Sequence, residues 1–241
     1  MREWQYKPSA LVNKSIAEGL TVFPRERDMT HSFFRIFWNM FWRGILKIYF
    51  RLSIQGKENL PQGQSFILIA NHSSHLDAVV LTSLLPIKSI DHAFSVAAKD
   101  YFFTSFWNSW FSAVLINALP FDRQKNKKES LELCGDVLNV SENVLIMFPE
   151  GTRSLTGEIQ TFKQGIGILA TGADYSVVPA YIHGAYEAFP KGRKFPKPNK
   201  VRVIIGKPLS FKDFERNQQE YEKVAHICEA EVRSLKESLN G

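Results

Sequence analysis

Short runs of apolar residues recur along the chain from residue 66 onward, and they are continuous rather than alternating with polar residues. Continuous runs of this length are typical of strands that are covered on both faces of a sheet. Six runs are predicted as strands: 66–70, 93–98, 113–117, 144–148, 177–182 and 201–205. The stretches between and after them are predicted as helices: 77–85, 100–110, 126–140, 162–172 and 214–240. This order predicts an α/β fold, with a mixed, largely parallel sheet flanked by helices.

A different pattern precedes the first strand, in the segment FFRIFWNMFWRGILKIYFR (33–51). Its polar side chains recur at every fourth position: Arg35, Asn39, Arg43, Lys47 and Arg51. Because four residues advance an α-helix by about 40° beyond a full turn, they form one cationic stripe beside a broad aromatic face. Such a helix suits the headgroup boundary of a membrane, where Trp38 and Trp42 would sit well. The alternative is a helix buried against the protein core, with its basic stripe in water.

These patterns divide the chain into an N-terminal segment with this amphipathic helix (1–51), an α/β domain (52–212) and a C-terminal helix that packs on the domain (213–241). A second aromatic stretch, YFFTSFWNSWF (101–111), could line a channel for an apolar chain, extend a membrane face or belong to an ordinary core. The segment 191–202 contains six basic residues and no acidic one. Such a run is usually a solvated loop, but it could also contact anionic lipid or an acidic carrier protein.

Composition and charge narrow the classes of partner. Hydrophobic residues make up 44% of the chain and charged residues 22%, which is typical of a folded globular protein. Residues 1–64 hold ten Lys or Arg against five Asp or Glu, so they carry +5 of the net charge of +6. This asymmetry indicates an anionic surface as partner, either a membrane or a nucleic acid. Nucleic acid is disfavoured because the basic residues lie among bulky apolar ones rather than on an open polar face.

The sequence carries no pattern for export or for an ordinary membrane span. The first twenty residues have no uninterrupted apolar core, and no apolar run reaches the length of about 18 residues that a spanning helix requires. The two cysteines, Cys134 and Cys228, are too few for a disulfide framework or a zinc site and indicate a reducing compartment. We therefore expect a peripheral or monotopic protein on the cytoplasmic face of a membrane.

The candidate catalytic residues follow the first predicted strand. In parallel sheets the ligand site lies at the carboxyl ends of the strands, and there the sequence reads NHSSHLD (71–77). His72 is suited to take a proton from a hydroxyl near neutral pH. Asp77, five residues later, can reach back to Nδ1 of the imidazole, which fixes the tautomer and stabilises the imidazolium. The nucleophile activated in this way would be a hydroxyl of the substrate itself.

Candidate anion-binding residues follow the other strands. Arg123 ends the segment ALPFDR, and Arg153 lies in PEGTRS, so both are expected on the face that carries His72. Guanidinium groups hold a phosphate in bidentate fashion. Gly151 permits a tight turn that brings backbone N–H groups to the ligand, and Lys99 could supply a third cation.

Taken together, these motifs resemble those of the glycerolipid acyltransferases, the family of bacterial 1-acylglycerol-3-phosphate acyltransferases. NHSSHLD is similar to the family's His-x4-Asp motif, and FPEGTRS is similar to its Pro-Glu-Gly-Thr-Arg motif. LPFDR matches the arginine-ending segment between them, VVPAYI resembles the fourth, proline-containing block, and AAKDYFF resembles Ala-Lys-x-x-Leu. Order and rough spacing agree over 66–182, about half the chain. Asn117 is a departure, because the family usually has glycine there.

The resemblance implies that the domain 52–212 transfers an acyl group from acyl-CoA or acyl carrier protein to a lysophospholipid hydroxyl, most commonly that of 1-acylglycerol-3-phosphate. It implies neither a covalent acyl-enzyme nor a cofactor or metal, with His72 as general base and Asp77 as the residue that orients it. Glu150 is awkward beside a phosphate dianion and is expected to hold an arginine in place or to bond a glycerol hydroxyl. The substrate-binding candidates are Lys99, Arg123, Glu150, Gly151 and Arg153.

Other interpretations remain open. The acceptor could be another lysolipid, or the chain could be a non-catalytic lipid-binding protein of the same fold, in which His72 would be dispensable. A hydrolase is a further alternative, with Ser73 or Ser74 as nucleophile or with a zinc ion on His72, His75 and Asp77. The sequence has neither a Gly-x-Ser-x-Gly elbow nor a second His or Cys cluster to complete a zinc site. His75 is the weaker candidate for the base, because it lacks a carboxylate at the motif spacing.

Overall fold

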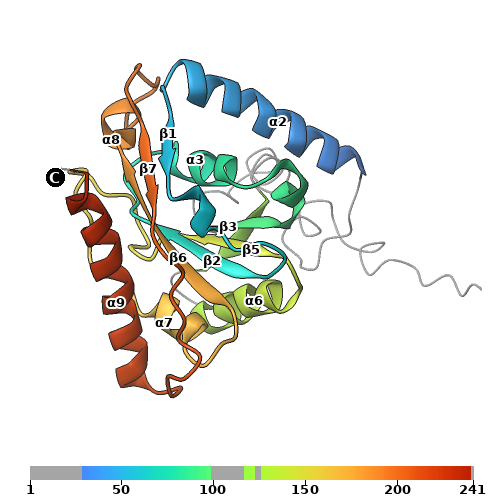
Figure 1. Cartoon of the computed structure of the whole chain (residues 1–241), viewed down its shortest axis with the longest axis vertical. Coiled ribbons are helices and arrows are strands. Elements are labelled where there is room, and N and C mark those ends of the chain that lie inside the picture. Colours follow the sequence, from blue (N-terminus) through green and yellow to red (C-terminus); the bar gives the residue numbers. More distant parts are fainter. Residues whose placement is uncertain (1–28, 99–116, 123–125, 240–241) are drawn as a thin grey trace, which may run out of the picture.

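A seven-stranded sheet with helices on both faces forms the centre of the protein (Figure 1). The computed structural model describes residues 29–98, 117–122 and 126–239. The strands are β1 (Ser53–Gln55), β2 (Phe66–Ala70), β3 (Ala93–Ala98), β4 (Ala118–Phe121), β5 (Val144–Met147), β6 (Ser176–His183) and β7 (Arg202–Ile205). Their order is β1-β7-β6-β2-β5-β3-β4, and every neighbouring pair is parallel except β6 with β7. The predicted mixed, largely parallel sheet is therefore confirmed.

The helices form a layer on each side of this sheet (Figure 1). The helices are α2 (Met29–Ile48), α3 (Asp77–Leu84), α6 (Lys127–Asn139), α7 (Gly165–Ala170), α8 (Ala185–Ala188) and α9 (Gln218–Glu237), with 3-10 turns at Lys57–Asn59 and Ile87–His92. Helices α2 and α3 pack in one hydrophobic core, whereas α6, α7 and α9 pack in a second core on the other face. Within the described part of the chain, every helix is too short or too polar to cross a bilayer.

Strand β2 shows why its apolar run is continuous. Phe66 and Leu68 belong to the core beneath α2 and α3. Ile67 and Ile69 belong to the core beneath α6, α7 and α9. Successive side chains of a strand point to opposite faces, and both faces of this strand are covered, so each position must be apolar.

One predicted strand is displaced along the sequence. An apolar run predicts it at 113–117, whereas the structure has β4 at Ala118–Phe121, and 113–116 lie outside the described residues. Asn117, directly before β4, has a φ of 48°, in the left-handed region that asparagine tolerates better than most residues. The segment LPF therefore forms part of the strand instead of following it.

Other boundaries also differ from the prediction. The helices expected at 162–172 and 214–240 are shorter, as α7 and α9. Strand β1 is not predicted, because three residues with exposed ends give no apolar pattern. The helix expected at 100–110 and the aromatic stretch 101–111 lie outside the described residues. The division of the chain at residues 51 and 212 stays a prediction.

The side of helix α2 that carries the basic stripe packs on the domain, whereas the sequence predicts that the stripe faces headgroups or water. Nη1 of Arg35 lies 2.6 Å from Oδ1 of Asp91, and the Arg35 side chain is 11% exposed. Arg43 donates to Oδ1 of buried Asn39 and to the carbonyl oxygen of Leu85. This part of the stripe anchors the helix on the protein instead of facing water or headgroups. The predicted exposure of the stripe is therefore wrong at Arg35 and Arg43. A guanidinium group can leave water where acceptors of the domain surround it, and the periodicity of the helix does not reveal those acceptors.

The aromatic side of α2 is the one that faces outward. Its exposed apolar side chains are Phe33, Phe34, Phe37, Met40, Phe41 and Ile48. Trp42 instead packs against the core beneath the helix, while Trp38 stacks on Phe41 and contacts Trp42 edge to face. Lys47 is exposed near the end of the helix. The alternative of a buried aromatic face is therefore also wrong, because most of that face remains uncovered.

Candidate active site

His72 and Asp77 are in direct contact where β2 ends and α3 begins. Nδ1 of His72 lies 2.9 Å from Oδ2 of Asp77. The carboxylate is fully buried, whereas the His72 side chain is 22% exposed. When Nδ1–H donates to this carboxylate, Nε2 is the ring nitrogen left to accept a proton from a substrate. The contact predicted from the spacing of the two residues is confirmed.

The turn between these two residues is closed by the same carboxylate. Oδ2 of Asp77 also accepts the backbone N–H groups of Ser73, at 2.7 Å, and Ser74, at 2.8 Å. The hydroxyl of Ser74 donates to the carbonyl oxygen of Phe189, while its oxygen accepts the N–H of Leu76 at 3.1 Å. Three donors thus converge on one oxygen of Asp77, which fixes the carboxylate before any substrate binds. Both serine side chains lie buried beside it.

The loop after β5 holds the backbone of His72 from both sides. The N–H of His72 donates to Oε1 of Glu150 at 2.8 Å, and its carbonyl oxygen accepts the N–H of Ser154 at 2.7 Å. The imidazole stacks on the Phe148 ring, with centroids 4.1 Å apart and planes 15° apart. Asn71, the preceding residue, exchanges two hydrogen bonds with the backbone of Ile182 on β6. The histidine is therefore fixed by three strands of the sheet.

Glu150 is a buried part of this support, with 2% of its surface exposed. Its Oε2 accepts from Nε2 of Gln160 at 3.1 Å, in addition to the bond with His72. Burial raises the pKa of Glu150 to about 7, against the opposing effect of these hydrogen bonds. No arginine of the described residues contacts the carboxylate, and Arg123 lies outside them, so the expected contact with an arginine stays a prediction. Its expected role as a substrate ligand stays a prediction.

Arg153, on the loop after β5 that also carries Glu150, lies beside His75 of the turn between β2 and α3. Its Nη1 is 2.6 Å from Nδ1 and 2.5 Å from Nε2 of the His75 ring. Burial, and then the charge of Arg153, lower the pKa of His75 to about 4, so the ring is neutral at neutral pH. The His75 ring also packs against Phe189, with centroids 4.9 Å apart. His75 thus contacts the candidate phosphate ligand rather than the candidate carboxylate.

Gly151 adopts the tight turn expected of it. Its φ is 73°, and its N–H donates to the carbonyl oxygen of Phe148 at 2.9 Å. A Cβ at this position would lie 2.6 Å from Nζ of Lys163, in a backbone conformation that side chains rarely adopt. The N–H of Gly151 itself is used in closing the turn, so the turn shapes the loop that carries Arg153.

Lys99 and Arg123 lie outside the described residues. The strands that lead to them, β3 and β4, are parallel and paired at Ala98 with Phe121. Their carboxyl ends therefore lie at the edge of the sheet that carries His72. The expected phosphate contacts of Lys99 and Arg123 stay predictions.

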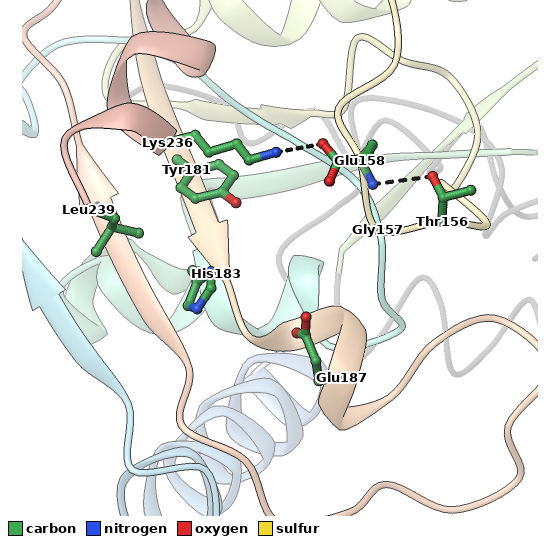
Figure 2. Close-up of a pocket in the computed structure, with 8 residues that line it drawn as sticks. All are labelled: Thr156, Gly157, Glu158, Tyr181, His183, Glu187, Lys236 and Leu239. Atoms are coloured by element: carbon green, nitrogen blue, oxygen red, sulfur yellow. Dashed lines mark hydrogen bonds and ion pairs between the residues drawn. The ribbon is translucent and has the colours of Figure 1, made fainter. Parts of the chain in front are cut away.

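A separate pocket of about 160 Å³ lies beside residues 156–158, further along the loop that carries Glu150 and Arg153 (Figure 2). It is lined by Thr156, Gly157, Glu158, Tyr181, His183, Glu187, Lys236 and Leu239. Lys236 and Glu158 form an ion pair at its rim, with Nζ 2.5 Å from Oε2. Burial raises the pKa of Tyr181 to about 12, so its phenol stays protonated. None of the residues predicted for catalysis or phosphate binding lines this pocket. Within the described part of the chain, no three His, Cys, Asp or Glu side chains are grouped to hold a metal ion.

Comparison with known proteins decides the family. A family model described as Acyltransferase matches residues 51–183, more than half of the chain. This chain belongs to the acyltransferase family. It is 32% identical over 201 residues to the 1-acyl-sn-glycerol-3-phosphate acyltransferase of Bacillus subtilis (strain 168), a match that covers 82% of this chain and 90% of that protein.

Two further relatives of this acyltransferase agree. It is 30% identical over 165 residues to a chloroplastic 1-acyl-sn-glycerol-3-phosphate acyltransferase of Arabidopsis thaliana, which covers 67% of this chain but only 44% of the plant protein. The crystal structure of the 1-acyl-sn-glycerophosphate acyltransferase from Thermotoga maritima has the same fold, with a TM-score of 0.68 at 24% identity. That match covers 91% of this chain and 87% of the other. The predicted class of enzyme, an O-acyltransferase, is confirmed.

Sequence reasoning missed several residues that build the site of this acyltransferase. Phe148, Asn71 and Gln160 have no catalytic chemistry of their own, so nothing marks them in isolation. Asn71 stands directly before His72, and a polar residue in a buried strand end was the one local signal available. The hydrogen bond from Gln160 to Glu150 joins two residues ten positions apart in the loop after β5, and no sequence pattern predicts it.

Proposed function

We propose that this acyltransferase moves a fatty acyl group from acyl-CoA or acyl carrier protein to the free hydroxyl of a lysophospholipid, with 1-acylglycerol-3-phosphate as the acceptor, in phospholipid synthesis. The contact between Nδ1 of His72 and Oδ2 of Asp77 carries the proposal, because it prepares a base for a hydroxyl. The relatives in Bacillus subtilis and Arabidopsis thaliana are named for this acceptor, which supports the choice.

The proposed reaction begins with the acceptor hydroxyl against Nε2 of His72. As the oxygen attacks the thioester carbonyl, its proton passes to Nε2, and buried Asp77 stabilises the imidazolium that forms. The tetrahedral intermediate collapses as the carbon–sulfur bond breaks. The imidazolium then returns the proton to the departing thiolate, which leaves an ester and a free thiol. The single proton that moves comes from the acceptor hydroxyl and ends on the thiol, so the reaction balances without a further reactant. We propose that no cofactor or metal takes part.

Arg153 is the proposed ligand of the acceptor phosphate. It directly precedes Ser154, whose N–H donates to the carbonyl oxygen of His72, so it lies close to the base. A guanidinium can hold a phosphate with two parallel hydrogen bonds, which would also orient the hydroxyl. Lys99 and Arg123 are proposed as further phosphate contacts. Glu150, through the backbone of His72, is proposed to keep the base in place.

The proposed location is the cytoplasmic face of a membrane, where the protein is peripheral or monotopic. Its acceptor is a lipid, and the outward side of α2 presents the exposed side chains of Phe33, Phe37 and Phe41. Aromatic side chains are suited to the boundary between headgroups and acyl chains. The partly buried Arg35 and Arg43, which bond the domain, hold this aromatic side outward.

The test is an acyl-transfer assay with the purified protein in detergent micelles. A panel of lysolipids is offered with acyl-CoA and with acyl carrier protein as donors, and His72→Ala is compared with the parent. We expect ester formation on 1-acylglycerol-3-phosphate and a loss of roughly 10² to 10⁴-fold in His72→Ala. A parent without transfer to any lysolipid would favour a non-catalytic lipid-binding protein. Transfer to a different lysolipid would correct the acceptor alone.

Two controls separate the hydrolase alternatives. A chelator that abolishes the parent's activity would favour a metal-dependent enzyme. Acyl-enzyme trapped on Ser73 or Ser74 would favour a serine nucleophile, although both side chains are buried. We expect neither result.

A further inference from the structure

The loop between α8 and β7 joins the candidate active site to the end of helix α2. At its start, Pro190 pairs with Ser74, and the carbonyl oxygen of Phe189 accepts the N–H of His75 at 3.3 Å. At its other end, the hydroxyl of Tyr49 donates to the carbonyl oxygen of Pro196 at 3.3 Å. Figure 1 shows this loop, in orange, beside the C-terminal end of α2. Any surface that α2 meets at this end therefore also meets the loop.

Five cationic side chains of this loop face solvent. The exposed cations are Lys191, Arg193, Lys194, Lys197 and Lys200. Residues 191–202 include no acidic side chain, and the ion pairs of the described residues involve none of the five cations. By contrast, Lys128 of α6 and Lys223 of α9 have acidic partners on their own helices, Glu132 and Glu220. The loop thus concentrates positive charge that nothing in the described chain neutralises.

A large apolar side chain stands in the middle of these cations. Phe195 is 79% exposed, between Lys194 and Pro196. Pro196 is the residue that Tyr49 bonds, and Ile48, beside Tyr49, is 80% exposed. Phe195 therefore lies next to the end of the outward apolar side of α2. A single exposed phenylalanine is common on a protein surface, but here it extends the exposed strip of Ile48 and Tyr49 among cations that the described residues leave unpaired, which points to a partner that is both apolar and anionic.

We propose that the loop 191–200 is a second membrane contact, which binds the headgroups of anionic phospholipids while Phe195 enters the interface. The proposal rests on the proposed function in one respect, the membrane contact of α2. An acidic carrier protein would satisfy the cations as well. The lipid surface is favoured because the apolar strip continues from Ile48 and Tyr49 to Phe195, as an interface plane requires.

This contact would also set the distance of the base from the membrane. The loop is bonded through Phe189 to Ser74 and His75, within the motif that carries His72. Two contacts, one on α2 and one on the loop, restrict the tilt of the domain, whereas one helix alone leaves it free to rotate. The anionic acceptor and the anionic product of the proposed reaction would both gather at the same cations.

The test measures binding of the full chain to vesicles by sedimentation. One set of vesicles is phosphatidylcholine, and the other also contains phosphatidylglycerol. The loop variant combines Arg193→Gln, Lys194→Gln and Lys197→Gln. A matched control removes the same charge from the opposite face of the sheet, with Lys127→Gln, Lys128→Gln and Lys223→Gln. Phe195→Ser is measured separately, and melting temperatures verify that each variant is folded.

Each cation near an anionic surface strengthens binding about fivefold, so the loop variant should bind anionic vesicles about 100-fold more weakly. Its binding to neutral vesicles should hardly change. The control variant should stay within a few-fold of the parent on both, and Phe195→Ser should weaken both. Equal losses in loop and control variants would overturn the proposal, because net charge alone would then explain them.

A second measurement separates the alternative partner and the proposed function. In detergent, the Michaelis constant for acyl carrier protein loaded with a fatty acyl group is compared between the parent and the loop variant. A rise there, with unchanged vesicle binding, would assign the loop to the carrier protein and overturn the proposal. A parent that binds anionic vesicles through the loop but transfers no acyl group would support this inference and contradict the proposed function.

Discussion

Nη1 of Arg153 lies 2.6 and 2.5 Å from the two ring nitrogens of His75, three residues after His72 in the same motif. An arginine N–H can donate only to a ring nitrogen that lacks a proton. Burial and the charge of Arg153 lower the pKa of His75 to about 4, which keeps the ring neutral. His75 is therefore placed to hold the guanidinium beside the candidate base.

The first prediction concerns this positioning contact. His75→Ala should raise the Michaelis constant for 1-acylglycerol-3-phosphate severalfold, because Arg153 loses a contact that restrains it, and should change turnover little. His75→Gln, which keeps an acceptor, should recover most of the loss. Steady-state kinetics of both variants are compared with His72→Ala, which should lose turnover. If His75→Ala lost turnover as severely as His72→Ala, the assignment of the base would be wrong.

A second prediction concerns the phosphate. Arg153→Ala should weaken use of a phosphate-bearing acceptor by about 10 to 150-fold, since a hydrogen bond to a charged group contributes about 1.5–3 kcal/mol. The Michaelis constant for the thioester donor should stay unchanged. Arg123→Ala is expected to act in the same direction. A monoacylglycerol, which has no phosphate, is the matched control acceptor. Equal loss with both acceptors would contradict a phosphate contact.

The third prediction concerns the buried carboxyl of Glu150. Its pKa is raised from 4.5 to about 7 by burial, so between these values it is ionised in the unfolded chain and protonated in the folded one. The folded state then binds more protons, and the free energy of unfolding must fall as pH rises through this window. A shift of this size corresponds to about 3 kcal/mol.

Glu150→Gln removes this titration and keeps the shape of the side chain. The free energy of unfolding of the parent minus that of the variant should therefore decline by up to about 3 kcal/mol between about pH 4.5 and 7, then level off. Urea unfolding at several pH values measures it. A difference that stays constant across the window would show that the carboxyl is ionised in the folded protein.

The fourth prediction separates the two parts of the basic stripe on α2. Arg35→Gln should lower the free energy of unfolding by about 1–3 kcal/mol, because Asp91 loses its partner in a mostly buried site. Lys47→Gln, on the exposed side of the same helix, is the control and should change stability by less than about 0.5 kcal/mol. Denaturant unfolding of both variants is the measurement. Equal stability of the two variants would mean that the Arg35 contact contributes nothing to docking the helix.

The sequence by itself determined the elements whose causes are local. His72 and Asp77 are five residues apart, so a single turn joins them, and their contact follows from spacing alone. The continuous apolar runs predict strands such as β2, because a strand covered on both faces needs an apolar side chain at every position. The start of β4 was misplaced, since the left-handed backbone of Asn117 leaves no mark in an apolar pattern.

Only the tertiary structure decided which side of α2 faces the protein and what Glu150 does. Periodicity shows that α2 has a cationic and an aromatic side, but Asp91, which receives Arg35, is 56 residues away. Glu150 reaches the backbone of His72 across 78 residues, because β2 and β5 are neighbours in the sheet. The pattern of hydrophobic and polar residues shows only that a side chain is polar. The hydrogen-bond partner that allows this side chain to be buried belongs to a distant strand or loop. The position of that partner depends on how the whole sheet assembles.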